Sequence, residues 1–249
     1  MSDWSIAREF LPAGYRLEVL ERTTSTNDVV RNCGAAGEAA GIVIAAEQQE
    51  AGRGRRGAAW VSPPGEGLAF SVLVRPTENK ALWPRLSMAA GLAVAEALER
   101  FGVTAEVKWP NDVWIKGRKI AGILVEAGED FVVAGIGVNV GVAEFPGELA
   151  ATATSLLIES GEAPALGAVL AAVVARFDVW QGAIGGRFDE LLRRLRERCA
   201  LTGHEISLIT ADGPRTGIAR GFGDGGELLL ESGGELQRII QADEVRVVG

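Results

Sequence analysis

Residues 105–128 read AEVKWPNDVWIKGRKIAGILVEAG, an apolar run interrupted by two short polar turns. The pattern predicts a strand, a turn and then a hairpin whose tip is Lys116-Gly117-Arg118. A stretch with helical periodicity, 82–102, precedes this run and stops at a glycine. The apolar segment 130–141 follows it as a further strand. Helices and strands therefore both contribute, and we predict an α+β domain.

The same pattern analysis extends to both ends of the chain. Further strands are predicted at 15–21, 41–48 and 68–76, and further helices at 28–37, 164–181 and 186–200. From Thr202 onward the pattern changes to short strands separated by the turn pairs Asp212-Gly213, Asp224-Gly225 and Gly233-Gly234. This pattern of short strands and turns predicts a small antiparallel barrel after the α+β domain. We therefore divide the chain into residues 1–200 and 201–249.

The chain is acidic, with a net charge of −8, and it has one histidine and two cysteines in 249 residues. An acidic balance disfavours broad nucleic-acid binding, which needs a basic face to displace counterions. The single histidine, His204, excludes a histidine-clustered metal site, and the separated Cys33 and Cys199 favour free thiols in a reducing compartment. No apolar run is long enough for a membrane span, and no secretory signal is visible. We expect a cytoplasmic protein that does not enter membranes.

A loop rich in glycine and arginine lies within EQQEAGRGRRGAAW, residues 47–60, where Arg53, Arg55 and Arg56 alternate with Gly52, Gly54 and Gly57. The spacing matches GxGxxG, but the two prolines that follow forbid the helix that a dinucleotide site needs, and no P-loop motif is present. Glycines let backbone N–H groups converge on one point, and arginines bind carboxylate or phosphate oxygens bidentately. We therefore predict an anion site; the alternative is a solvated surface turn.

A second group of polar residues lies in KWPNDVWIKGRKIAG, residues 108–122. Lys108 and Lys119 face one cleft if the predicted hairpin forms, with Asn111 and Asp112 between them. Lysines beside a carboxylate and an amide suit a nucleotide that carries Mg²⁺. The alternative, an ordinary charged hairpin tip, does not account for Lys108 in its apolar strand.

Two shorter motifs suggest further contacts. In GIGVNV, residues 135–140, Gly135 and Gly137 weaken a strand unless something approaches its backbone closely. Asn139 offers both a donor and an acceptor, as an adenine edge requires, although a buried asparagine satisfied by the backbone fits equally well. Ser25-Thr26-Asn27 has the composition of a helix N-cap, which can also present a hydroxyl to a small polar ligand.

The chain resembles the biotin–protein ligase (biotin–[acetyl-CoA-carboxylase] ligase) family. The resemblance rests on four motifs in this order: STN, QxAGRGRRGxxW, KWPND with RKIAGIL, and GIGVN. It extends from residue 16 to 249. It implies that biotin and ATP form biotinyl-adenylate, with Mg²⁺, and that biotin then passes to a lysine of the biotin carboxyl carrier protein. It also implies a mixed sheet with flanking helices, related to class II aminoacyl-tRNA synthetases, and a C-terminal SH3-like barrel.

The resemblance further implies roles for individual residues. The expected catalytic residues are Lys119, Arg55 and Lys108, of which Lys119 bridges the biotin carboxylate and the α-phosphate. The expected biotin-binding residues are Ser25, Thr26, Asn27, Gln49, Gly52, Arg53, Arg55, Lys119, Gly135 and Gly137. The expected ATP-binding residues are Arg53, Arg56, Trp60, Lys108, Asn111, Asp112, Asn139 and Arg220, and Asp112 is also the expected Mg²⁺ ligand.

The sequence departs from the family pattern at two points. Ala58 stands where some members carry another basic residue, so adenylate is expected to be held with one fewer cation. Residues 1–15 are too few for the N-terminal DNA-binding domain of bifunctional members, so a monofunctional ligase that does not bind operator DNA is expected. A homodimer is compatible with the family. The alternatives are a lipoate or octanoate ligase of the same superfamily and a non-catalytic biotin-sensing module.

Overall fold

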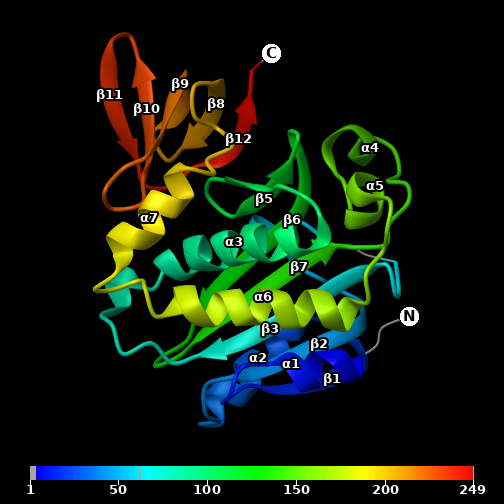
Figure 1. The fold of residues 1–249 in the computed structure, drawn as a ribbon. Helices are drawn as coiled ribbons and strands as arrows, with labels where there is room; N and C mark the ends of the chain where they lie inside the picture. Colours follow the sequence, from blue (N-terminus) through cyan, green and yellow to red (C-terminus); the bar gives the residue numbers. More distant parts are fainter. Residues whose placement is uncertain (1–3, 62, 249) are drawn as a thin grey trace.

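A seven-stranded mixed sheet forms the centre of the molecule, and its strand order is β1-β2-β3-β7-β6-β5-β4 (Figure 1). The computed structural model describes residues 4–61 and 63–248. The strands are β1 (Arg16–Thr23), β2 (Ile42–Gln49), β3 (Gly67–Val74), β4 (Glu106–Lys108), β5 (Asp112–Ile115), β6 (Arg118–Ala127) and β7 (Val132–Asn139). Strands β1 and β2 are parallel, and the other neighbours are antiparallel.

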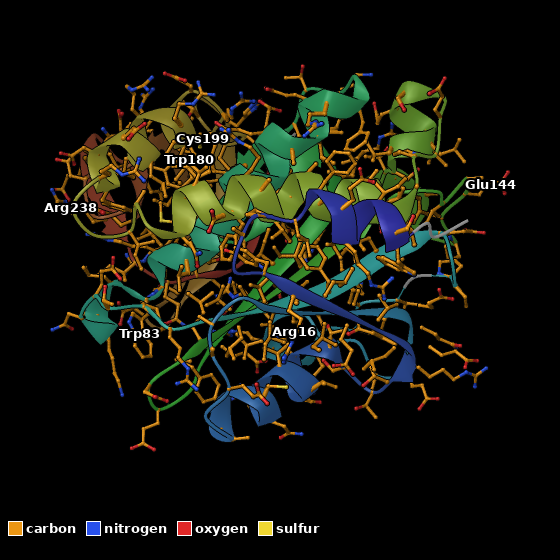
Figure 2. All side chains as sticks on the ribbon, turned by 60° about the horizontal axis from the view of Figure 1, so that its bottom comes forward. Arg16, Trp83, Glu144, Trp180, Cys199 and Arg238 are labelled. Atoms are coloured by element: carbon orange, nitrogen blue, oxygen red, sulfur yellow. The ribbon has the colours of Figure 1, made fainter. Side chains whose placement is uncertain are left out.

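Helices cover both faces of this sheet, because alternate strand residues point to opposite sides. Val43 and Ala45 of β2 pack in the large core together with α1 (Trp4–Phe10), α3 (Arg85–Leu98) and α6 (Leu166–Gln181). Ile42 and Ile44 point the other way, into a smaller cluster with Val30 of α2 (Thr26–Ala35). Figure 2 shows α1 and α6 above the strands and α2, in blue, below them. The central strands β3 and β7 are buried along their whole length.

A second, five-stranded antiparallel sheet ends the chain, with strand order β11-β10-β9-β8-β12. It follows helix α7 (Phe188–Arg196), and its strands are β8 (Glu205–Thr210), β9 (Gly213–Phe222), β10 (Leu228–Ser232), β11 (Glu235–Ile239) and β12 (Asp243–Val247). Its buried residues, such as Leu208 and Phe222, belong to the same hydrophobic cluster as α3 and α6. This terminal sheet is therefore packed against the rest of the chain.

The predicted α+β fold, with a mixed sheet and flanking helices, is confirmed, and the terminal strands form a small β unit as expected. The division between residues 200 and 201 stays a prediction. The sequence patterns did not predict α1 or the short helices α4 (Leu149–Thr152) and α5 (Leu156–Ser160), because four to seven residues give too few turns for a helical period. Two predicted helices, 82–102 and 186–200, end earlier, at Leu98 and Arg196. In the described part of the chain, no helix is both long and apolar enough to cross a bilayer.

Candidate active site

A cavity of about 730 Å³ opens between the central sheet and the terminal sheet. Its walls come from the start of α2, the Gly/Arg loop (residues 52–57), strands β4 to β7 and the beginning of β12. The predicted site residues among its lining are Ser25, Thr26, Asn27, Gln49, Arg53, Arg55, Arg56, Trp60, Lys108, Asn111, Asp112, Lys119, Gly135 and Gly137. Residues far apart in the sequence are thus brought to one place.

The start of α2 forms a polar wall of the cavity. Ser25 is the N-cap residue by its extended backbone, but its side chain makes no capping hydrogen bond. Both the backbone N–H and the hydroxyl of Thr26 donate to Oε1 of Gln49, at 2.8 and 3.1 Å. Asn27 donates through Nδ2 to Oε2 of Glu126 at 2.7 Å. These bonds fix the orientation of the Thr26 and Asn27 side chains.

Two polar residues that the sequence analysis missed support this wall. Ser71 is fully buried in β3, and its hydroxyl lies 2.7 Å from Oγ1 of Thr26 and 2.6 Å from Oδ1 of Asn27. The carboxylate of Glu126, on β6, accepts a hydrogen bond from the Asn27 amide and also forms an ion pair with Arg31 at 3.2 Å. The one signal for Ser71 was a hydroxyl inside the otherwise apolar run GLAFSVLV. Buried polar groups need partners, and these residues supply them.

A side chain closely approaches each of the two β7 glycines: Trp60 lies against Gly137, and Asn27 lies against Gly135. A Cβ at Gly137 would overlap the Trp60 indole, and a Cβ at Gly122 would lie 3.2 Å from the same ring. A Cβ at Gly135 would overlap Oδ1 of Asn27. The absence of side chains at these glycines therefore forms a slot over β6 and β7, which the Trp60 indole and the Asn27 side chain enter.

Gly137→Ala is expected to lower the free energy of unfolding by about 1–3 kcal/mol, because the added methyl group overpacks against the indole. Chemical denaturation of the single variants and of a Gly137→Ala, Trp60→Ala double variant measures this cost. In the Trp60→Ala background the cost should nearly vanish, since the two positions are in contact. Gly141→Ala is the matched control, because a Cβ there makes ordinary contacts. An undiminished cost in the double variant contradicts the assignment.

Lys108 and Lys119 face the same cleft, as predicted, and Asp112 lies between them. Nζ of Lys119 is 2.7 Å from Oδ1 of Asp112, and Nζ of Lys108 is 3.9 Å from Oδ2. Lys108 also lies 4.5 Å above the ring of Trp114. Burial lowers the pKa of Lys108 below its ordinary value; Asp112 partly opposes this shift, and Lys119 lowers the pKa further. An anion placed between the two ammonium groups would relieve their repulsion.

Each of the three arginines of the Gly/Arg loop has a carboxylate or amide partner, while the side chains of Arg53 and Arg56 stay exposed. Arg53 forms a bidentate pair with Asp28 at 2.6 and 2.7 Å, and hydrogen bonding from this guanidinium lowers the pKa of Asp28. Arg55 donates to Oδ1 of Asn111 at 3.3 Å. Arg56 pairs with Asp243 of the terminal sheet.

Three predicted site residues do not line the cavity. Gly52 lies behind Trp60: a Cβ there would meet the Trp60 carbonyl, so this glycine allows the loop to close on itself. Asn139 is 6% exposed, and its amide donates to the carbonyl of Thr154 at 3.0 Å, which is the alternative considered for it. Arg220 pairs with Glu231 within the terminal sheet at 2.6 Å. Arg246 of β12 lines the cavity from that sheet instead.

The electrostatic balance of the lining is opposite to that of the whole chain. Its basic side chains are Arg53, Arg55, Arg56, Lys108, Lys119 and Arg246, and its acidic ones are Asp112, Asp243 and Glu244. The excess is three positive charges in a protein of net charge −8. Such a cavity attracts anions and stabilises negative charge that develops at its centre.

The predicted Mg²⁺ ligand, Asp112, has no acidic companions in a metal-binding arrangement. Among residues 4–61 and 63–248, no group of three or more His, Cys, Asp or Glu side chains is placed to hold a metal ion. A single carboxylate beside two lysines fits the way Mg²⁺ binds with nucleotides, through one or two carboxylates together with phosphate oxygens. The residues present are therefore compatible with a metal that arrives with a nucleotide.

Comparisons with known proteins agree with this arrangement. Residues 19–142 match the Biotin/lipoate A/B protein ligase family. A biotin–[acetyl-CoA-carboxylase] ligase of Mycobacterium tuberculosis is 34% identical over 94% of this chain and 91% of its own length. The protein of the same name from Paracoccus denitrificans is 35% identical over 91% of this chain and 98% of its own length.

A solved structure shares the whole architecture. The biotin protein ligase from Aquifex aeolicus in complex with biotin and ATP superposes with a TM-score of 0.84 at 30% identity, over 94% of this chain and 99% of that chain. The sequence identity, the nearly complete coverage and the shared fold agree with one another. The chain therefore belongs to the Biotin/lipoate A/B protein ligase family, and within it to the biotin protein ligases.

Proposed function

We propose that this protein is an ATP-dependent biotin–protein ligase that makes biotinyl-adenylate and transfers biotin to a lysine of the biotin carboxyl carrier protein. The observation that carries the proposal is the cationic pair Lys108 and Lys119 around Asp112, beside the glycine slot of β6 and β7. The relatives named biotin–[acetyl-CoA-carboxylase] ligase and the structural neighbour with biotin and ATP support the same reaction.

The first half-reaction brings two anions together. A carboxylate oxygen of biotin attacks the α-phosphorus of ATP, the bond to the bridging oxygen breaks, and pyrophosphate leaves. Lys119, whose side chain is 35% exposed, can exchange Asp112 for the reacting carboxylate and α-phosphate. Arg55, Arg56 and Lys108 lie around it and stabilise the remaining phosphate charge.

The polar wall and the glycine slot suit the other end of the substrate. Ser25, Thr26, Asn27 and Gln49 offer hydroxyl and amide groups to a ureido ring, and Gly135 and Gly137 let Asn27 and Trp60 lie close to the sheet beside it. Arg53 closes this side. Trp60, Asn111 and Asp112 are assigned to ATP, with Asp112 as the carboxylate for Mg²⁺, which supplies Lewis-acid stabilisation of phosphate oxygens when bound.

The second half-reaction consumes the adenylate. The lysine amine of the carrier attacks the acyl carbon, the acyl–phosphate bond breaks, AMP leaves and the amine loses a proton. The glycine-rich loop contributes by keeping water from the mixed anhydride until the amine arrives. Action in the cytoplasm is a further part of this proposal.

Pyrophosphate release and carrier labelling together test the proposal. The protein is incubated with ATP and either biotin or lipoate, first alone and then with a carrier domain. Biotin-dependent pyrophosphate release followed by carrier biotinylation is expected. Preferential release with lipoate would favour the lipoate ligase, and biotin binding without pyrophosphate release would favour the non-catalytic sensor.

A further inference from the structure

Asp243, at the start of the last strand, contacts the Gly/Arg loop across more than 180 positions of sequence. Its carboxylate pairs with Arg56 and lies 4.0 Å from Arg55, and its side chain is 15% exposed. The carbonyl of the preceding residue, Ala242, accepts a hydrogen bond from Arg55 at 3.5 Å. Two adjacent residues of the terminal sheet therefore hold two arginines of the loop.

The backbone is strained on both sides of this contact. Arg56 has φ 54° inside the short 3-10 turn Arg55–Gly57, and Glu244, next to Asp243, has φ 46°. Lys116 is the remaining non-glycine residue with positive φ in the described chain, and it lies at a hairpin tip before Gly117, where such a turn is ordinary. Left-handed non-glycine residues persist where the surrounding structure fixes them, often at ligand clamps.

The contact also sets the position of Arg55 relative to the reacting groups. Arg55 reaches Asn111 on one side and the terminal sheet on the other, so it spans the cavity next to Asp112. Arg53 is anchored separately, by its bidentate pair with Asp28. Asp243 therefore holds Arg55 and Arg56, in the half of the loop assigned to the nucleotide. Asp28 holds Arg53, in the half near the polar wall.

From this geometry we propose that Asp243 is a positioning residue: through Arg55 and Arg56 it keeps the adenylate in the cavity until the acceptor lysine arrives. The inference rests on the proposed function. Three cations in a glycine-rich loop repel one another, so a loop without this carboxylate populates positions away from the phosphate. The competing interpretation is a structural ion pair that only joins the two sheets, which for partly exposed arginines stabilises the fold by about 0–1 kcal/mol.

The test compares Asp243→Asn, Asp243→Ala and Asp243→Glu with the parental protein. The release of adenylate from the preformed complex, the KM for ATP and the Kd for biotin are measured. The Asp243→Asn and Asp243→Ala variants should release adenylate about tenfold faster than the parental protein, because each loses a charge-assisted hydrogen bond. Both variants should also have a higher KM for ATP. The Kd for biotin should stay within twofold, because Asp28 still anchors Arg53. Asp243→Glu should restore slow release.

Asp224→Asn is the matched control, because Asp224 forms an ion pair between α7 and the terminal sheet, 2.7 Å from Arg196, outside the cavity. It should leave adenylate release unchanged. Equal release rates for Asp243→Asn, Asp224→Asn and the parental protein would overturn the inference while leaving the ligase function intact. If the parental protein forms no adenylate, the proposed function itself fails, and the inference fails with it. Should Asp243→Ala not fold, the isosteric Asn variant decides.

Discussion

Lys119→Ala is expected to slow adenylate formation about 100- to 1000-fold, the range seen when one pre-organised charge-stabilising group is removed from an active site. Lys119 supplies an ammonium group 2.7 Å from Asp112, at the point where the Gly/Arg loop, β4 and β6 converge. Its neighbour Lys108 is more deeply buried and lies against Trp114, so it cannot move freely into the vacated position. Biotin-dependent pyrophosphate release under single-turnover conditions measures the rate.

Two comparisons make this prediction specific. Transfer from added biotinyl-adenylate should suffer less than adenylate formation, because no triphosphate has to meet a carboxylate in that step. Lys116→Ala is the matched control: this lysine belongs to the same hairpin, but its side chain is 77% exposed and pairs with Glu159 away from the cavity. It should keep the parental rate. Adenylate formation at the parental rate by Lys119→Ala would remove Lys119 from its catalytic role.

The sequence predicted the positions of the two lysines because local rules govern them. A strand, a turn and a hairpin place Lys108 on β4 and Lys119 on β6, with Asp112 opening β5 between them. Similarly, Gly135 and Gly137 are two residues apart on one strand, so they share a face of the sheet. In both cases the positions of the residues follow from a short segment and from the two-residue period of a β-strand.

Asn139 and Arg220 show where such reasoning ends. Asn139 follows Gly137 with the same period, but a distant segment crosses the end of β7, and there the Thr154 carbonyl accepts the Asn139 amide hydrogen. The backbone N–H of Thr154 bonds to the carbonyl of Lys119, so this crossing is part of the tertiary structure. Arg220 and Arg246 both lie in the terminal sheet, and only the strand order, with β12 at its edge, puts Arg246 in the cavity. No local pattern encodes either arrangement.

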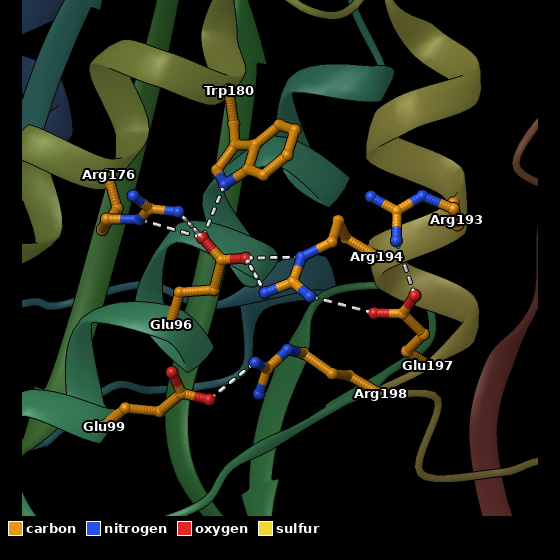
Figure 3. Close-up of polar contacts among 8 residues, drawn as sticks. All are labelled: Glu96, Glu99, Arg176, Trp180, Arg193, Arg194, Glu197 and Arg198. Carbon is orange, nitrogen blue, oxygen red and sulfur yellow. Dashed lines mark hydrogen bonds and ion pairs between the residues drawn. The ribbon is translucent and has the colours of Figure 1, made fainter.

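Glu96→Ala is expected to lower the free energy of unfolding by about 3 kcal/mol, although Glu96 lies outside the cavity lining. Glu96 lies on α3 and is 5% exposed. Its carboxylate accepts hydrogen bonds from Arg176 and Trp180 of α6 and from Arg194 of α7 (Figure 3). Removal of the carboxylate leaves two guanidinium groups and an indole N–H facing one another. The estimate is at the low end for a broken buried pair, because the side chains of Arg176 and Arg194 are 40% and 31% exposed and partly reach water.

The acid dependence of stability gives a second measurement. Burial would raise the pKa of Glu96, but hydrogen bonds from Arg176, Trp180 and Arg194 outweigh it, so the pKa in the folded protein lies below the ordinary glutamate value. A lowered pKa contributes stability that is complete above the unfolded-state value, about 4.3, and is lost as the pH falls through the folded-state value. The difference in unfolding free energy between the parental protein and Glu96→Ala should therefore be constant near neutral pH and shrink in acid.

Glu99→Ala is the matched control for Glu96→Ala. Glu99 follows α3 directly and pairs with Arg198 at 2.6 Å, but its side chain is 45% exposed (Figure 3). Arg198 is 14% exposed, but water can reach the half-exposed Glu99, so the loss of this single pair should cost about 1 kcal/mol, less than the loss of Glu96. Guanidinium denaturation of both variants makes the comparison. If both variants lost the same unfolding free energy, the Glu96 cluster would contribute no more to stability than the Glu99–Arg198 pair. Apolar packing would then account for the association of α3, α6 and α7.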